Sequence, residues 1–173
     1  MKITKLFPPF ERNAEVLMVI YLPNKKILLQ TKSFYPNGVY RIFSGGLKKN
    51  ETPKGAFDRE LKEETDVVAI NKQFLGKIIF RIKHSKGVKN YRVYVFLVKS
   101  KSNVVKNLHG DKYATKFRQV KISELPQIAK KLEMLQKGPK SSMYPVSNWN
   151  EWGKFRSKQH SIVYKLLKNY LQL

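Results

Sequence analysis

Residues 45–67 read GGLKKNETPKGAFDRELKEETDV and hold six of the 12 acidic residues in a chain with 35 lysines and arginines. Within this segment Glu60, Glu63 and Glu64 are spaced i, i+3 and i+4, which places them on one face of a helix. Carboxylates this close together repel one another unless a positive group lies among them. The segment therefore predicts a helix whose acidic face holds a cation.

The same segment carries the signals that begin a helix, which we expect over about residues 52–65. Thr52 suits the N-cap, and Pro53 suits the first helical position because the N–H it lacks would have no partner there. Phe57 and Leu61 form an apolar seam beside the acidic face. The helix is thus expected to pack through one side and to carry its carboxylates next to that side.

Apolar and β-branched segments on both sides of this helix predict strands. They are residues 16–22, 27–31, 39–43, 74–82, 91–98 and 117–122. The polar residues between 74–82 and 91–98 indicate a long hairpin, and Gly45 with Gly46 predicts a tight bend after the third strand. Strands, a helix, more strands and then helices predict an α/β fold with a mixed sheet and helices on its faces.

Two further helices are expected after the last strand. Ser123 caps the first of these, and Gly138-Pro139 stops it. The second covers about residues 151–171 and is amphipathic, with an apolar stripe on one face. Its basic face consists of Lys154, Arg156, Lys158, Lys165 and Lys168. No repeat or second domain is visible, so residues 1–173 are expected to form one domain that ends in this amphipathic helix.

The composition indicates a soluble, cytoplasmic protein. The longest apolar run, residues 16–22, is far shorter than the roughly 20 residues that a membrane-spanning helix needs. The first ten residues contain no apolar stretch adequate for a secretory signal. The chain has no cysteine, which excludes disulfides, thiol nucleophiles and zinc–cysteine sites.

The formal net charge of +23 attracts polyanions such as RNA or polyphosphate. The charge comes from 28 lysines and only seven arginines, although arginine is the better residue for bidentate recognition of phosphates and bases. A lysine excess of this kind also follows from a biased genome composition and keeps a protein soluble. Both interpretations of the charge stay open: solubility, or a polyanionic substrate or partner.

Residues 45–67 match a signature that reads Gly, five residues, Glu, seven residues, then Arg-Glu-aliphatic-x-Glu-Glu-x-Gly-aliphatic. Eight of its nine specified positions agree: Gly45, Glu51, Arg59, Glu60, Leu61, Glu63, Glu64 and Val67. The chain thus resembles the Nudix hydrolase family, and chance agreement of the Gly, the Arg and the four Glu has a probability of ~10⁻⁸ per window. The resemblance implies a Nudix-type α/β/α sandwich and a pyrophosphohydrolase.

The resemblance also implies roles for residues of the segment. The expected ligands of Mg²⁺ or Mn²⁺ are Glu60, Glu63, Glu64 and Gly45. The three glutamates and Arg59 form the expected catalytic group, and Arg59 pairs with Glu51 to orient the helix and the preceding loop. Carboxylate oxygens suit these hard cations, which neutralise a diphosphate and lower the pKa of a bound water.

Three features depart from the family pattern. Asp66 replaces a glycine at a position that often needs a left-handed backbone, so we expect a cost in stability. Ser44 replaces the usual proline before the glycine pair. Many members place a further acid in a downstream loop, for which Asp111 is the nearest candidate and Glu151 the next.

Several functions agree with these observations. The favoured one is metal-dependent hydrolysis of a diphosphate linkage in a nucleoside diphosphate-linked small molecule. The alternatives are an RNA 5′-pyrophosphohydrolase or polyphosphate hydrolase, and a non-catalytic nucleotide- or RNA-binding Nudix module. Arg41, Gly46 and Arg81 are the candidates for contact with the substrate. We expect a monomer or homodimer with no membrane partner.

Overall fold

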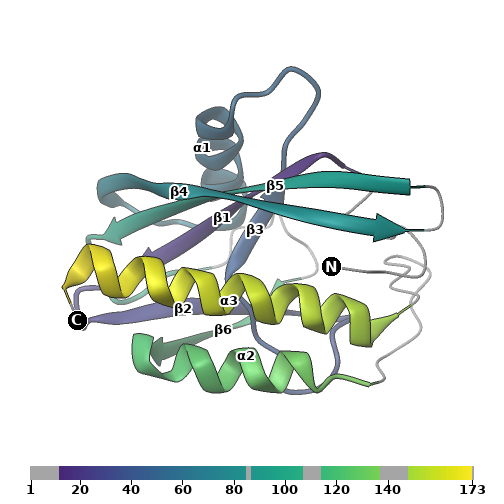
Figure 1. The fold of residues 1–173 in the computed structure, drawn as a ribbon. Coiled ribbons are helices and arrows are strands. Elements are labelled where there is room, and N and C mark those ends of the chain that lie inside the picture. The colour runs from purple at the N-terminus through teal and green to yellow at the C-terminus, as the bar shows by residue number, and fades with distance from the viewer. Residues whose placement is uncertain (1–11, 85–86, 107–113, 137–147, 173) are drawn as a thin grey trace.

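The computed structural model describes residues 12–84, 87–106, 114–136 and 148–172. The elements of its first half are β1 (Ala14–Tyr21), β2 (Lys26–Lys32), β3 (Phe43–Gly46), α1 (Pro53–Glu64) and β4 (Ala69–His84). Those of its second half are β5 (Gly87–Ser100), β6 (Ala114–Lys121), the 3-10 turn η1 (Ile122–Glu124), α2 (Leu125–Glu133) and α3 (Trp149–Leu171). Figure 1 shows these elements as one sheet with helices on both faces.

The six strands form a mixed sheet in the order β4-β5-β1-β2-β6, and β3 also pairs with β1. β1 runs parallel to β5 along its whole length. On its other edge β1 pairs antiparallel with β3 through residues 15–18 and with β2 through Ile20 and Tyr21. Both β2 and β3 therefore lie beside α1: Gln30 of β2 contacts Glu64, and Gly45 of β3 lies against Glu60.

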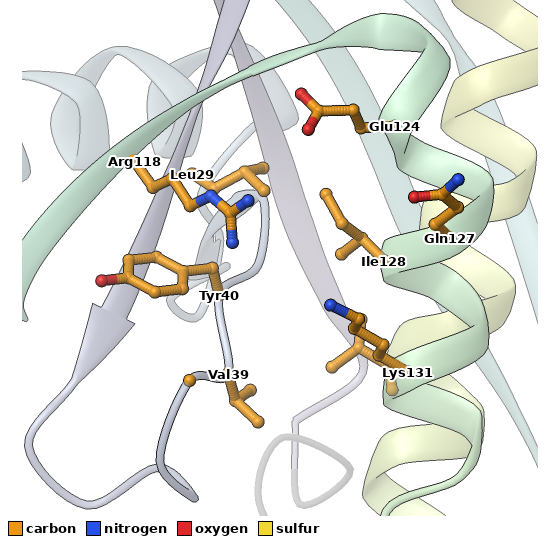
Figure 2. A pocket seen from close by; sticks show the side chains of 10 residues that line it. Leu29, Val39, Tyr40, Arg118, Glu124, Gln127, Ile128 and Lys131 are labelled. Carbon is orange, nitrogen blue, oxygen red and sulfur yellow. The ribbon is translucent and has the colours of Figure 1, made fainter.

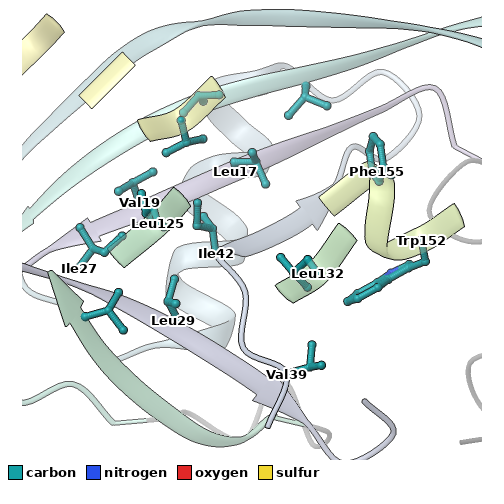
Figure 3. Close-up of a cluster of buried hydrophobic side chains, with 14 of the residues drawn as sticks. Leu17, Val19, Ile27, Leu29, Val39, Ile42, Leu125, Leu132, Trp152 and Phe155 are labelled. Atoms are coloured by element: carbon teal, nitrogen blue, oxygen red, sulfur yellow. The ribbon is translucent and has the colours of Figure 1, made fainter. Parts of the chain in front are cut away.

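Alternating side chains of β1 divide the molecule into layers. Val16 and Met18 pack in the cluster under α1, whereas Leu17 and Val19 pack in the cluster under α2 and α3. Figure 3 shows the second cluster, in which Leu132 from α2 and Trp152 from α3 meet the sheet. The predicted mixed-sheet α/β/α sandwich is confirmed.

The third strand differs from its prediction. Residues 39–43 were expected to form it, but β3 begins at Phe43. Before that point only Arg41 bridges to Gln30 of β2, and the backbone N–H of Ile42 donates to the ring of His160 rather than to a strand. The glycine pair forms no tight bend, because Gly45 and Gly46 pair with β1 as the end of β3.

The hairpin is longer than predicted. β4 and β5 extend over residues 69–84 and 87–100, so much of the expected connecting loop is strand. The register shifts between Phe74 and Gly76, which marks a bulge in β4. The polar residues near the turn form strand because they lie on an exposed face, where side-chain polarity does not oppose pairing.

The helix boundaries follow their caps. Thr52 accepts a hydrogen bond from the N–H of Gly55 (3.0 Å), as predicted for α1. Ser123 caps no helix; it lies in η1, and the Glu124 carboxylate accepts from the N–H of Lys121 (2.6 Å). Asn148 caps α3, which therefore begins earlier than expected. The expected stop at residues 138–139 lies outside the described residues, and α2 ends at residue 133.

Two expectations about charged residues are wrong. Arg156, placed on the basic face of α3, is 2% exposed. Asp66 does not adopt a left-handed backbone, because α1 ends at Thr65 in an extended conformation. The Asp66 carboxylate instead accepts a hydrogen bond from the N–H of Lys106 (2.6 Å), so its place beyond α1 has a stabilising partner. No helix in the described parts of the chain has the length and hydrophobicity to cross a membrane.

Candidate functional site

Glu60 lies against the end of β3. Gly45 carries no side chain, and a Cβ atom built there would overlap the carboxyl group of Glu60. The next glycine, Gly46, leaves room that the side chain of Arg12 fills. The glycine pair thus lets α1 approach the sheet closely enough to bring a carboxylate onto the backbone of β3.

Arg59 joins the carboxylates of this region. Its Nε and Nη2 donate to the two carboxylate oxygens of Glu51 at 2.7 and 2.9 Å. Its Nη1 donates to Glu60 (2.7 Å) and Glu63 (3.1 Å), and Nη2 also donates to the carbonyl oxygen of Gly46 (3.0 Å). One guanidinium therefore fixes three carboxylates relative to β3, with the bidentate geometry that arginine alone provides. We call Glu51, Arg59, Glu60 and Glu63 the α1 cluster.

The pairing of Glu51 with Arg59 shifts the pKa values of both groups. The hydrogen bonds from Arg59 lower the pKa of Glu51 to about 2, against the opposing effect of desolvation and with help from the N–H of Lys48. Hydrogen bonding to Glu51 raises the pKa of Arg59. The pair is therefore ionised at every physiological pH.

Glu64 lies apart from the α1 cluster, in a buried position beside β2. Gln30 Nε2 donates to one of its oxygens at 3.4 Å, and Lys32 Nζ lies 3.9 Å from the other. The Oε1 atom of Gln30 is buried and has no hydrogen-bond partner among the described residues. Sequence reasoning missed Gln30 and Lys32, although a polar Gln30 within the apolar segment KILLQTK is a visible signal.

The side chains of this region fit a divalent cation in donor type. The α1 cluster and Glu64 bring four carboxylates together, and Arg59 and Lys32 are among the cations that contact them. Carboxylates are hard oxygen donors, and the Oε1 atom of Gln30 adds a neutral one. Over the described residues, no three acidic, histidine or cysteine side chains lie close enough together to hold a metal ion, and three of the carboxylates contact Arg59 instead.

The structure does not bring Arg41 and Arg81 to the α1 cluster. Arg41 is buried and donates to Tyr35, to the carbonyl oxygen of Ile42 (2.9 Å) and to the hydroxyl of Ser44 (2.6 Å). Arg81 lies on the edge strand β4, which β5 and β1 separate from β3. Gly46 does lie in the site, where its carbonyl oxygen accepts from Arg59.

The candidates for a further acid are not in the described site. Asp111 lies outside the described residues. Glu151 is in the first turn of α3, where its N–H donates to Asn148. Because α3 covers the opposite face of the sheet from α1 (Figure 1), the sheet stands between Glu151 and Glu60.

A second arginine–carboxylate cluster lies on that opposite face. Arg156 Nη1 donates to Glu15 (2.8 Å) and to Gln159 (2.8 Å), and the Gln159 amide donates to Glu15. His160 completes this α3 cluster, because its Nε2 accepts from the N–H of Ile42 (3.1 Å) and Nδ1 therefore donates to the carbonyl oxygen of Arg156 (2.7 Å). Complete burial lowers the pKa of His160 to about 4.

A small cavity of about 70 Å³ lies between the sheet and α2. Figure 2 shows Tyr40 and Arg118 on one side of it and Glu124 and Lys131 on the other. None of the acidic residues predicted for the site lines this cavity.

Comparison with known proteins gives a family and a fold. The family model described as "NUDIX domain" matches residues 11–142. No curated protein matches the chain in sequence. Among solved structures, the NUDIX domain of Shewanella oneidensis NrtR, solved with ADP ribose, is 13% identical, with a TM-score of 0.51 over 86% of this chain and 87% of that one.

Two further structures are similar. DR0079 from Deinococcus radiodurans is 14% identical, with a TM-score of 0.51 over 72% of this chain and 77% of that one. A NUDIX hydrolase from Nitrosomonas europaea is 21% identical, with a TM-score of 0.49 over 69% and 78%. At these identities, the first two similarities establish the shared fold.

Proposed function

The chain belongs to the NUDIX domain family, and we propose that it is a pyrophosphohydrolase of the Nudix kind. We propose further that it uses Mg²⁺ or Mn²⁺ and cleaves a diphosphate linkage in a nucleoside diphosphate-linked compound. The observation that carries this proposal is the gathering of four carboxylates, those of Glu51, Glu60, Glu63 and Glu64, along α1 in a protein whose net charge is +23. Carboxylates concentrated in this way in so basic a protein favour a site for a divalent cation.

Glu60, Glu63 and Glu64 are the residues that would hold the metal ion, together with the backbone of Gly45. When bound, the ion would neutralise the charge of a diphosphate and make a water molecule more acidic. Arg59 positions the carboxylates through its contacts with Glu60, Glu63 and Glu51. It orients the site in this proposal and does not touch the reacting atoms.

Glu63 is the carboxylate best placed to receive a proton from an attacking water. Its side chain is 47% exposed, while those of Glu60 and Glu64 are 13% and 7% exposed. A general base must be within reach of the water it activates, and exposure permits this for Glu63. Its contact with Arg59, at 3.1 Å, is also the longest that Arg59 makes to a carboxylate among the described residues.

The substrate class rests on charge as well as on the family. A diphosphate bridge is anionic, and the net charge of +23 draws anions toward the protein before they reach the acidic site. NrtR binds ADP ribose in a structure of the same fold, which makes a nucleoside diphosphate derivative a reasonable first test compound. We also propose a cytoplasmic location, in keeping with the absence of cysteine.

Phosphate release with Mg²⁺ and with Mn²⁺ tests the function on nucleotide sugars, dinucleoside polyphosphates, nucleoside triphosphates and triphosphorylated RNA. We expect turnover of at least one nucleoside diphosphate-linked compound, and loss of that turnover in EDTA. Glu63→Gln should lower kcat by about 100-fold or more, the usual effect of losing a general base.

Glu133→Gln is the matched control, because Glu133 is an exposed glutamate on α2, on the other face of the sheet. It should leave kcat unchanged. Unaltered turnover of every active substrate by Glu63→Gln would remove the metal-site assignment, whereas inactivity of the native protein on the whole panel would favour a binding module.

A further inference from the structure

The two faces of the β4–β5 hairpin differ in what covers them. Phe80, Ile82 and Tyr91 point to one face and are buried in the cluster under α2 and α3. The residues between them point to the other face, which α1 covers only at its end near Phe57 and Phe96. Beyond that end the second face is exposed, and we call it the hairpin face.

The hairpin face is strongly basic. On β4 it carries Lys77, Ile79, Arg81 and Lys83, and the residues opposite them on β5 are Tyr94, Arg92, Asn90 and Val88. Lys72, which lies opposite Val98 of the cluster under α1, extends the same face along β4. Neither strand contains an acidic residue over the described ranges 69–84 and 87–100. The face therefore presents a row of cations separated by apolar and aromatic side chains.

An aromatic groove lies at the end of the hairpin face, between β4, β5 and the first turn of α1. Its volume is about 490 Å³, and its walls include Phe57, Phe74, Tyr94 and Phe96. Phe74 is 48% exposed although its ring packs on Phe96 with centroids 5.2 Å apart. Lys54 and Lys72 also line the groove, and the Nζ atom of each lies 2.7 Å from a carboxylate oxygen of Asp58. The groove is wide enough for a flat aromatic ring and offers Phe74 as a surface for stacking.

We propose that the hairpin face and its groove bind a single strand of nucleic acid. A backbone of phosphates would follow the cations of β4 and β5, and one base would enter the groove and stack on Phe74. Aromatic platforms within a positively charged track are the features that bind single strands without reading their sequence. The proposal goes beyond the hydrolase function and does not depend on it, because the α1 cluster lies on the other flank of α1, beside β3.

Charge decides between this partner and the other candidates for an exposed sheet face. A second copy of the chain would bring the same row of cations against itself, and lysines on an edge strand oppose such pairing. An anionic lipid surface would match the charge, but it has no flat ring to fill the groove. A single-stranded nucleic acid matches both the charge and the aromatic groove.

Fluorescence anisotropy of the intact protein in EDTA tests the proposal without turnover. The probe is a fluorescein-labelled oligouridylate of about 12 nucleotides, within the usual site size of such surfaces. Phe74→Ala should weaken binding by roughly 5- to 150-fold, the effect of losing one stacked base. Phe74→Leu keeps an apolar side chain beside Phe96 and should show a comparable loss, so a folding defect of the alanine variant cannot imitate the result.

The charge component is tested with a matched pair of double variants. Lys77→Gln with Arg92→Gln should reduce the slope of log K against log salt by about 1.4 between about 50 and 200 mM salt. Lys130→Gln with Lys165→Gln removes the same charge from exposed positions on α2 and α3 and should leave the slope unchanged.

Two results would overturn the proposal. One is an equal effect of the two double variants, which would show that only net charge matters; the other is unchanged binding in both Phe74 variants. Phosphatidylserine vesicles serve as the competing ligand. Vesicle binding that depends on Lys77 and Arg92, without binding of the oligonucleotide, would assign the face to a membrane surface and would also reject the proposal.

Discussion

The α1 cluster and the α3 cluster each centre on one arginine, but they differ in charge balance and exposure. Arg59 contacts three carboxylates, and its side chain is 19% exposed. Arg156 contacts one carboxylate, Glu15, and both side chains are 2% exposed. In the α3 cluster one buried carboxylate thus balances one buried guanidinium, whereas in the α1 cluster three carboxylates share one partly exposed guanidinium.

This difference distinguishes the α3 cluster, a structural ion pair, from the α1 cluster, a candidate binding site. A buried pair whose charges cancel has nothing left to attract a ligand, and its partners are fixed by desolvation. The Arg156 guanidinium also packs on the rings of Phe155 and Trp152, at 5.1 and 5.8 Å from their centroids. In the α1 cluster, by contrast, the three carboxylates share one arginine and keep part of their surface open to solvent.

The largest effect is expected from breaking the α3 cluster. Arg156→Leu leaves the Glu15 carboxylate buried without its cation, which should lower the free energy of unfolding by about 3–5 kcal/mol. Urea denaturation measures the change. Adding Glu15→Leu to the same chain should restore most of the stability, because the double variant buries no unpaired charge. A single variant as stable as the native protein would contradict the structural role of this pair.

Acid should affect the two clusters in different pH windows. The folded state lowers the pKa of His160 from 6.5 to about 4, so the unfolded state binds the extra proton and stability is lost as the pH falls through that range. The pKa of Glu51 falls from 4.5 to about 2 on folding, so its contribution is complete above about 4.5 and is lost as the pH falls toward 2. The lowered pKa of His160 makes the free energy of unfolding about 3 kcal/mol smaller below pH 4 than above pH 6.5.

Unfolding free energies measured from pH 7 to pH 2 check these windows. His160→Gln should flatten the curve between pH 6.5 and 4, and Glu51→Gln should flatten it only below about 4.5. The Glu51 step should be the smaller one, because its side chain is partly exposed and solvent screens the pair. If Glu51→Gln flattened the curve near pH 6, the assignment of the step below pH 4.5 to Glu51 would be wrong.

A divalent cation should stabilise the protein through the α1 cluster and not through the α3 cluster. At a free Mg²⁺ concentration tenfold above Kd, binding adds about 1.4 kcal/mol to the free energy of unfolding. Thermal unfolding with and without EDTA measures it as a rise in Tm. Glu60→Gln combined with Glu63→Gln should abolish the rise, while Glu133→Gln should retain it. The same rise in both variants would show that the ion binds elsewhere.

The smallest effect is expected from Arg59→Lys. Lysine keeps the charge but cannot hold Glu51 and Glu60 together with a planar fork, so hydrogen bonds are lost. The cost in stability should be about 1 kcal/mol, because lysine keeps the charge and water reaches this partly exposed position. The activation free energy of hydrolysis, obtained from kcat, should change by more than the free energy of unfolding does. Measuring kcat and chemical denaturation on the same variant would show this. A loss of stability as large as that of Arg156→Leu would remove the contrast between the clusters.

Local patterns predicted much of this structure. The family and the sandwich fold are confirmed, and α1, expected over about residues 52–65 with Thr52 as its cap, spans Pro53–Glu64. The spacing of the acids at i, i+3 and i+4 predicted their place on α1, but Glu64 contacts Gln30 and Lys32 whereas Glu60 and Glu63 contact Arg59. The positions of these glutamates in a metal site, and the extent of the domain over residues 1–173, stay predictions.

The features that the sequence did not predict depend on contacts between distant segments. The helical pattern predicts Arg156 as an exposed cation of an amphipathic helix. Its burial is favourable because its guanidinium contacts the Glu15 carboxylate on β1. The start of β3 shifts because His160 takes the N–H of Ile42. Gln30 and Lys32 reach Glu64 only through the pairing of β2 with β1 and the packing of α1. No local period encodes these relations.

The contact between Glu15 and Arg156 also constrains how the protein is made, since the two residues are 141 positions apart. At roughly 5–20 residues per second, a ribosome adds Arg156 about 7–28 seconds after Glu15. During that time the first strand cannot bury its carboxylate, because the guanidinium that neutralises it does not yet exist. The sandwich must therefore close after most of the chain has been synthesised, and a nascent chain stalled before α3 keeps its first strand hydrated and open to chaperones.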